Sequence, residues 1–206
     1  MAWRTWISFW VFRMNVLVIF CHPRTHSYNH ALAERVVQVL ETLDHTVVFH
    51  DLYREHFDPV LEEAELHRKL SFDPVVLRHI GELERADALV IIHPDWWSQP
   101  PALLKGWIER VLQIGVAYEF EGPEFMKKRQ RPLLSEKIAL VFATRDGNEQ
   151  DELLSRLWID GVFRYCGFKA SSCHVLHGLR DLDRSDRFQW LDRVESVLMR
   201  TLPRGT

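Results

Sequence analysis

The sequence predicts an α/β fold, a doubly wound five-stranded parallel sheet in the order 2-1-3-4-5 with helices on both faces. Two observations support this class. Short apolar runs typical of buried strands alternate with stretches whose apolar residues recur at helical spacing. The chain has 206 residues, 47% of them apolar, which is enough for one domain with a full core. Right-handed crossovers leave few ways to wind such a sheet, and this order is a common one.

The elements are expected in strict alternation along the chain. The apolar runs predict strands over 15–21, 46–49, 88–92, 137–143 and 171–176. Helical spacing predicts helices over 31–40, 62–70, 73–85, 149–166 and 185–201, with one more after Pro101. Asp73 followed by Pro74 is a typical helix start. The one long loop expected, 117–136, carries a basic cluster at 127–131 that we interpret as solvated surface.

The first 13 residues form an extension to a single domain that we place at 14–206. Apolar residues recur there at helical spacing, which would suit a weak anchor on a membrane surface. The segment is too short to span a bilayer, and it leads directly into the first strand. We expect that it is disordered, or that translation starts at Met14.

Composition excludes several classes of function. The net charge of −3 and the isoelectric point near 6.4 do not suit a nucleic-acid-binding protein. The 11 histidines are scattered rather than grouped at ligand spacings, so we expect no metal site. Three cysteines fall inside predicted strands or helices, where a thiol usually acts as a small apolar side chain. This usage predicts a reduced, cytoplasmic protein.

The loop after the third strand, 94–107, is rich in tryptophan and proline. Pro94 and the pair Pro100-Pro101 restrict the backbone, so Trp96 and Trp97 should be held in place together with the amides between them. Such a loop at the carboxyl edge of a sheet suits a planar ligand. The alternative is that both indoles are ordinary core or interface aromatics.

The loop after the first strand, 22–29, carries groups that suit a phosphate. It has neither the glycine pattern of a nicotinamide-binding Rossmann fold nor that of a nucleotide triphosphatase. Thr25, Ser27 and Asn29 supply donors, His22 and Arg24 can add positive charge, and the amides that open the next helix form an anion site. The alternative is that Ser27 only caps this helix and His22 only ends a strand.

A third polar loop, 143–148, follows the fourth strand. Because the carboxyl ends of parallel strands meet at one edge, all three loops should converge there. The loop after the first strand and the loop after the third strand together indicate that the ligand is a flavin.

Several segments, in order, carry a resemblance to a known family. They are 22–29, 51–53 with 57–60, 94–110, 115–120 and 163–168. From about 15 to 201 the chain resembles the flavodoxin-like NAD(P)H:quinone oxidoreductases. The resemblance implies a homodimeric flavoprotein with FAD, or alternatively FMN, in which Tyr118, Phe120 and 51–60 close the neighbouring subunit's pocket. NAD(P)H and a quinone-like acceptor would use that pocket in turn, in a two-electron ping-pong reaction.

The flavin site that we expect comprises two groups of residues, one catalytic and one that contacts the cofactor. We expect Arg145 and Trp97 to take part in catalysis. Cofactor contacts are expected from His22, Thr25, Ser27, Tyr28, Asn29, Pro94, Asp95, Trp96, Trp97, Ser98, Thr144, Arg145, Gly147 and Asn148.

The chain departs from the mammalian members in the loop after the fourth strand. It lacks their Tyr and His between Thr144 and Ile159, and Arg145-Asp146 replaces the start of their glycine-rich turn. The shorter loop is similar to that of the bacterial branch. Arg145, with Thr144 and nearby amides, is the predicted substitute for stabilising the charge left by hydride transfer. The alternative for Arg145 is a surface ion pair with Asp146 or Asp151.

Two rival functions remain open at this point. The bacterial branch includes ancillary subunits of membrane potassium efflux systems, so the protein could bind flavin mainly to regulate a transporter. It could also be a one-electron carrier, although such carriers are usually more acidic and lack the tryptophan-proline loop.

Overall fold

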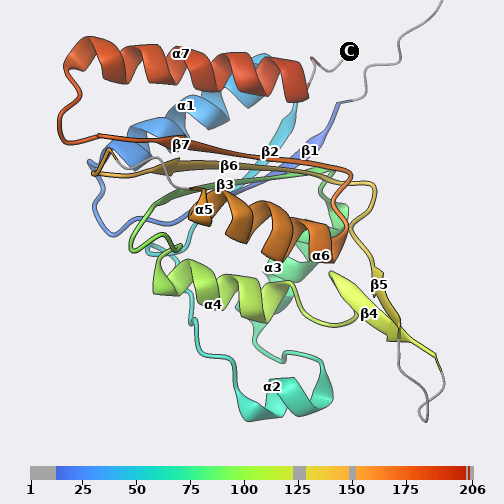
Figure 1. The fold of residues 1–206 in the computed structure, drawn as a ribbon. Helices are drawn as coiled ribbons and strands as arrows, with labels where there is room; N and C mark the ends of the chain where they lie inside the picture. Colours follow the sequence, from blue (N-terminus) through green and yellow to red (C-terminus); the bar gives the residue numbers. More distant parts are fainter. Residues whose placement is uncertain (1–12, 123–128, 149–151, 203, 205–206) are drawn as a thin grey trace, which may run out of the picture.

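A computed structural model describes residues 13–122, 129–148, 152–202 and 204. Its centre is a five-stranded parallel sheet in the order β2-β1-β3-β6-β7 (Figure 1). The bounds are β1 Asn15–Phe20, β2 Thr46–Asp51, β3 Ala88–Pro94, β6 Ile138–Thr144 and β7 Ala170–Leu176. The predicted fold class and strand order are therefore confirmed.

Helices cover both faces of this sheet, as expected for strands that are apolar on both sides (Figure 1). Helices α1 (Tyr28–Thr42) and α7 (Arg184–Thr201) pack on one face with Val16, Val18 and Phe20 of β1. Helices α3 (Pro74–Arg85) and α4 (Ala102–Val111) pack on the other face with Leu17 and Ile19. Alternate residues of one strand thus serve two separate cores.

Helix starts follow local chemistry. Asp73 caps α3, because its Oδ1 accepts a hydrogen bond of 2.8 Å from the Val75 amide, and Pro74 occupies the first turn. Helix α2 (Glu63–Arg68) is shorter than predicted. Lys69 adopts a left-handed backbone with φ of 55° and ends it.

The expected loop 117–136 contains a hairpin that the sequence analysis missed. Strands β4 (Tyr118–Glu121) and β5 (Arg129–Pro132) pair antiparallel outside the main sheet. Their stabilising contacts are polar, since Arg131 pairs with Glu119 and Glu121. Strand β4 alternates aromatic and acidic residues over only four positions, and β5, with the sequence Arg-Gln-Arg-Pro, lacks the apolar alternation by which strands are recognised. Residues 127 and 128 of the basic cluster lie outside the described residues.

The predicted helix 149–166 is interrupted in its backbone pattern. Its described part consists of α5 (Leu153–Arg156), a π-helical segment η1 (Leu157–Phe163) and α6 (Arg164–Cys166). Gly167 ends it with φ of 81°, and a Cβ there would lie 2.4 Å from Pro132. A π-helical segment of seven residues is too short for the spacing of apolar residues to distinguish it from an α-helix.

The remaining sequence expectations concern the extension and the cysteines. Residues 1–12 of the extension lie outside the described residues. Cys21 and Cys166 are buried, Cys173 is partly buried, and all three are free thiols. Burial raises the pKa of Cys21 and Cys166 to about 12, so these thiols are unreactive. Within the described ranges, every helix is too short or too polar to cross a bilayer.

Candidate functional site

A cleft of about 1050 Å³ opens where β1, β3 and β6 end. It is therefore at the edge of the sheet where ligands of open α/β folds bind. The lining residues come from all three predicted loops and from the segment after β7. They are His22, Pro23, Arg24, His26, Ser27, Tyr28, Asn29, Pro94, Asp95, Trp96, Trp97, Thr144, Asp146, Leu179, Arg180 and Arg187.

Most of the predicted site residues line this cleft, namely His22, Ser27, Tyr28, Asn29, Pro94, Asp95, Trp96, Trp97 and Thr144. The others, Thr25, Ser98, Arg145, Gly147 and Asn148, do not belong to its described lining. The three loops thus converge as expected. Several of their residues hold the loops in place instead of facing the cleft.

The amino terminus of α1 forms one wall. Ser27 caps this 15-residue helix, since its Oγ accepts a hydrogen bond of 3.2 Å from the His30 amide. The capping role considered for Ser27 is therefore real, and the residue lines the cleft as well. A helix of this length presents a partial positive charge and amide donors at its start, which suits an anion.

Asn29 connects this wall to β6. Its Nδ2 donates a hydrogen bond of 2.7 Å to Thr144 Oγ1, and both side chains are buried. Asn29 Oδ1 is also buried, and the described residues offer it no donor. A buried acceptor without a donor is costly unless a ligand or water satisfies it. Both residues line the cleft, so this oxygen is a candidate contact for a ligand.

Burial is the largest cause that lowers the pKa of His22 below the usual value, which disfavours the positive charge expected of this ring. Its Nδ1 accepts a hydrogen bond of 3.0 Å from the Arg24 amide and also lies 3.3 Å from the Arg24 carbonyl. The His22 and Trp96 rings lie 6.2 Å apart. Positive charge in this loop comes from the Arg24 side chain.

The tryptophan loop is a tight turn with an unusual backbone. Trp96 and Gln99 exchange two backbone hydrogen bonds of 3.0 and 3.1 Å. Between them Trp97 and Ser98 have φ of 62° and 58°, values that favour glycine or asparagine. Such a conformation costs about 1–2 kcal/mol per residue and is often retained for function. Trp97 is 96% exposed, so it is not a core residue of this chain.

Arg145 lies behind the cleft wall. Its side chain is buried, its Nε donates a hydrogen bond of 2.5 Å to Asp95 Oδ2, and its Nη2 is 3.2 Å from Ser98 Oγ. Asp146, considered as its surface partner, pairs with Arg180 at 3.1 Å. Asp151 lies outside the described residues. Arg145 is therefore a buried link between two site loops rather than a solvated surface group.

Gly147 and Asn148 support the segment after β7. The Gly178 amide donates a hydrogen bond of 2.9 Å to the Gly147 carbonyl, and the Leu179 amide donates one of 3.0 Å to the Arg145 carbonyl. Gly178 has φ of 67°, and a Cβ there would lie 2.1 Å from Asn148 Oδ1. The positive φ favours glycine at this position, and the two residues that follow it, Leu179 and Arg180, line the cleft.

Two cationic residues that follow β7 and line the cleft, Arg180 and Arg187, were not predicted from the sequence. The Arg187 carbonyl accepts a hydrogen bond of 2.7 Å from the Tyr28 hydroxyl, and the Arg187 guanidinium donates to the Leu179 carbonyl at 3.1 Å. Burial raises the pKa of Tyr28, which remains a donor. A signal was available, because the fifth parallel strand must end at the same edge as the others.

The cleft therefore combines a helix amino terminus, three arginines, two indoles carried on a tight turn, and a buried acceptor to which the described residues offer no donor. Cationic groups and amides suit phosphates, and the indoles with the nearby amides suit a flat ring that carries heteroatoms. These features fit a flavin nucleotide. The volume also exceeds the range of about 300–1000 Å³ that is typical of small-molecule sites.

Comparison with known proteins places the chain in a family. The model of the flavodoxin-like fold matches residues 14–197. A protein called an uncharacterized NAD(P)H oxidoreductase, from Haemophilus influenzae, is 33% identical over 168 residues, which are 76% of this chain and 80% of that protein. The chain belongs to the flavodoxin-like family of NAD(P)H oxidoreductases.

Two further relatives show the same relationship. The rat NAD(P)H dehydrogenase [quinone] 1 is 25% identical over 211 residues, which cover 88% of this chain and 76% of that enzyme. The solved structure of an NAD(P)H:quinone oxidoreductase from Methanothermobacter marburgensis matches with a TM-score of 0.75 at 28% identity. That match covers 90% of this chain and 95% of that protein. The family resemblance found in the sequence is confirmed.

Proposed function

We propose that this protein is a flavin-dependent NAD(P)H:quinone oxidoreductase that transfers two electrons in a ping-pong reaction. The observation that supports this most is the cleft itself. One wall is the amino terminus of α1, another is the rigid turn at Trp96–Gln99, and the family to which the chain belongs uses NAD(P)H. NAD(P)H and the acceptor would occupy the same space in turn.

Each wall has its own task in this proposal. The α1 amides with Arg24, Arg180 and Arg187 bind the phosphates, and Trp96, Trp97 and Thr144 orient the ring. The bound flavin supplies the hydride chemistry, whereas the protein supplies position and charge. We predict FAD, for which the large cleft has room, and FMN is the alternative.

Arg145 acts from behind the wall in this proposal. Its guanidinium is fixed by Asp95 and Ser98 before any ligand binds, and preorganised donors lower barriers more than mobile ones. Asp95 compensates part of its charge, so the contribution expected of Arg145 is smaller than that of an unpaired cation. A direct catalytic role for Arg145 and Trp97 remains a prediction.

The enzyme would be a homodimer. An apolar hollow of about 340 Å³ lies between α2, α4, β4 and η1. Large apolar side chains at or beside it are exposed, including Leu66, Phe120 and Tyr165. Exposed apolar groups around a hollow are typical of a protein–protein interface. A second copy of this chain fits the family resemblance of Tyr118, Phe120 and the segment 51–60.

The direct test is the colour of the purified protein. We expect visible flavin absorbance, and chromatography of the heat-released cofactor would distinguish FAD from FMN. His22→Ala with Ser27→Ala should lower flavin occupancy while the folded sheet is retained, as judged by circular dichroism. Ser196→Ala, on the exposed face of α7, is the matched control. A colourless protein that gains no absorbance with FAD or FMN would contradict the proposal.

The rival functions make different predictions. Steady oxidation of NAD(P)H with a quinone would exclude a one-electron carrier. A regulatory subunit of a potassium efflux system should co-purify with its transporter, and the comparisons lend no support to that role. A cytoplasmic location remains a prediction from cysteine usage.

A further inference from the structure

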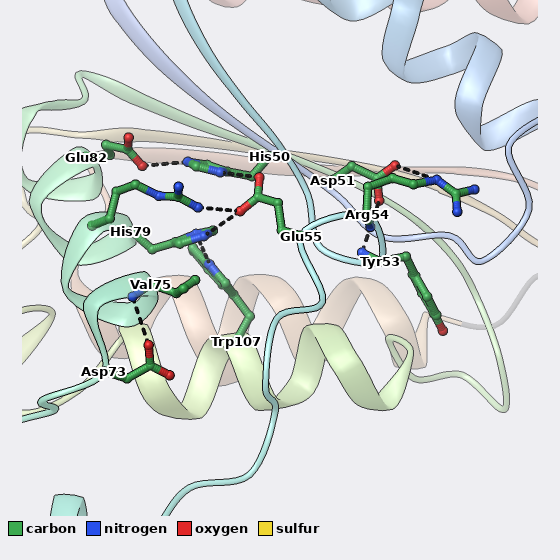
Figure 2. Close-up of polar contacts among 11 residues, drawn as sticks. His50, Asp51, Tyr53, Arg54, Glu55, Asp73, Val75, His79, Glu82 and Trp107 are labelled. Atoms are coloured by element: carbon green, nitrogen blue, oxygen red, sulfur yellow. Dashed lines mark hydrogen bonds and ion pairs between the residues drawn. The ribbon is translucent and has the colours of Figure 1, made fainter.

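A second polar cluster surrounds the carboxyl end of β2, outside the lining of the cleft. Figure 2 shows His50 of β2 between Glu55, which lies in the loop after that strand, and Glu82 of α3. His79, also on α3, lies against the His50 ring, with 3.9 Å between ring centroids. His50 and His79 are buried. Of these residues only Glu55 belongs to a segment that the proposed function uses, the segment 51–60 of the homodimer.

Both ring nitrogens of His50 face carboxylate oxygens. Nδ1 is 2.7 Å from Glu55 Oε1, and Nε2 is 2.5 Å from Glu82 Oε2 (Figure 2). An ionised carboxylate only accepts hydrogen bonds, so each nitrogen must carry a proton to make both contacts. A neutral ring would place a lone pair against one carboxylate. The contacts therefore require the imidazolium form.

We infer that His50 is held as an imidazolium and acts as a proton-dependent latch that fastens the loop 51–57 to α3. With the proton present, one cation joins a carboxylate of the loop to a carboxylate of the helix. Loss of the proton breaks one of the two contacts. The inference does not rest on the flavin site, although the loop belongs to the segment 51–60 that the proposed homodimer uses.

His79 is the neutral partner in this cluster. The Trp107 indole N–H of α4 donates a hydrogen bond of 3.0 Å to His79 Nδ1. The His79 proton is therefore on Nε2, which lies 3.2 Å from Glu55 Oε2 (Figure 2). Burial, the largest cause, lowers the pKa of His79 to about 4. The positive charge belongs to His50.

The charges around the cluster agree with a positive charge on His50. Arg78 of α3 donates a hydrogen bond of 2.7 Å to Glu55 Oε2. Arg85 lines a small hollow together with Glu82, whereas β1 places the apolar Ile19 opposite His50. His50 and Arg78 then offset Glu55 and Glu82. A neutral His50 would leave the two carboxylates with one cation fewer in a largely buried site, which is unfavourable.

A metal ion fits this cluster less well than a proton does. The ligand atoms of His50, Glu55 and His79 lie within 4.8 Å of one another, which is close enough for a shared ion. A metal on His79 Nε2 would move that ring's proton to Nδ1, where it would oppose the buried N–H of Trp107. The hydrogen-bond direction therefore favours the latch.

The latch controls only the tip of the loop. Leu52 and Phe57 at its base are buried in the core, and the Tyr53 amide bonds to Asp51 Oδ1 at 3.0 Å whether or not His50 is charged. Glu55, in contrast, is held by His50, His79 and Arg78. Opening should therefore be local, at residues 55 and 56, while the sheet remains intact.

Nitrogen-15 NMR of the full chain tests the proton directly. The His50 ring should show two protonated nitrogens. Where the ring loses one of these protons, amide exchange at 55 and 56, corrected for intrinsic rate, should increase about ten- to a hundredfold, the scale of one charged hydrogen bond. Exchange in β1 should stay constant.

Glu82→Gln supplies the matched variant. Its amide can contact a neutral ring, so the step in amide exchange with pH should disappear, whereas Glu84→Gln on the exposed face of α3 should retain it. If Glu82→Gln does not fold, the titration of the unmodified protein decides. A His50 ring that has one protonated nitrogen while both carboxylate contacts persist, or exchange that is unchanged when the second proton is lost, would overturn the latch. Stoichiometric Zn²⁺ binding that shifts both His50 and His79 would replace it with a metal site.

Discussion

Asp95 and Arg145 form a buried ion pair across the ends of β3 and β6, with Arg145 Nε 2.5 Å from Asp95 Oδ2. The backbone supports the pair, since the Asp95 amide donates a hydrogen bond of 2.7 Å to the Thr144 carbonyl. Asp95 lines the cleft, whereas Arg145 stands behind it. The pair therefore couples two ligand-facing loops and fixes the charge distribution between them.

Arg145→Ala should lower the free energy of unfolding by about 3–5 kcal/mol, because it leaves the Asp95 carboxylate buried without its cation. The double variant Asp95→Leu with Arg145→Met removes both charges, so its loss should be much smaller than the sum of the single losses. Denaturant unfolding of the flavin-free protein measures this coupling. Additive losses would show that the two side chains act independently.

Arg145→Ala should also slow flavin reduction by NAD(P)H about ten- to a thousandfold, the scale of removing one preorganised donor, while flavin stays bound. Asp95→Asn is the control, because it keeps the Arg145 cation and removes the compensating charge, so its reduction rate should not fall to that extent. Stopped-flow absorbance measures the rate of flavin reduction in both variants. An unchanged rate in Arg145→Ala would restrict Arg145 to a structural role.

Trp97→Gly should be more stable than Trp97→Ala by about 1 kcal/mol, because glycine adopts φ near 62° without a steric cost. Both variants remove the same exposed indole, so their difference isolates the backbone. Thermal unfolding of the flavin-free protein provides the measurement. If the indole orients the ring, both variants should bind flavin more weakly to a similar degree. Equal stability of the two would mean that the turn is not strained.

Leu66→Glu should shift the protein from dimer to monomer, because it places a charge in the apolar hollow beside α2. Phe188→Glu is the matched control, since Phe188 is also exposed but lies on α7, on the opposite face of the sheet. Sedimentation velocity at micromolar concentration distinguishes the two states. A monomeric unmodified protein with full activity would contradict the homodimer.

Stability should fall on acidification between about pH 6.5 and about pH 4. Burial lowers the pKa of His79 and His93 to about 4, whereas both titrate near 6.5 when unfolded. The unfolded chain therefore binds up to two more protons than the folded one in that window, which favours unfolding by roughly 1.4 kcal/mol per pH unit for each histidine. Denaturant unfolding at several pH values measures the slope, and His93→Gln should reduce it by about half. A slope unchanged in that variant would show that His93 is not involved.

The strand order and the three site loops were predictable from the sequence. Continuous apolar runs require a sheet buried on both faces, and parallel strands then bring their following loops to one edge. The hairpin β4–β5 was missed, because β5 has no apolar alternation and pairs with β4 through contacts that include those of Arg131 with Glu119 and Glu121.

Sequence alone thus determined the five strands of the main sheet, most of the helices and the three site loops, since strand and helix signals are local patterns of apolar residues, proline and capping side chains. Tertiary structure decided what individual polar side chains do. Arg145 lies 50 residues from Asp95, Asn29 lies 115 from Thr144, and His50 lies 32 from Glu82. Whether a buried charge is paired, and whether a histidine carries one proton or two, depends on such distant partners, because desolvation and hydrogen bonding act through space and not along the chain.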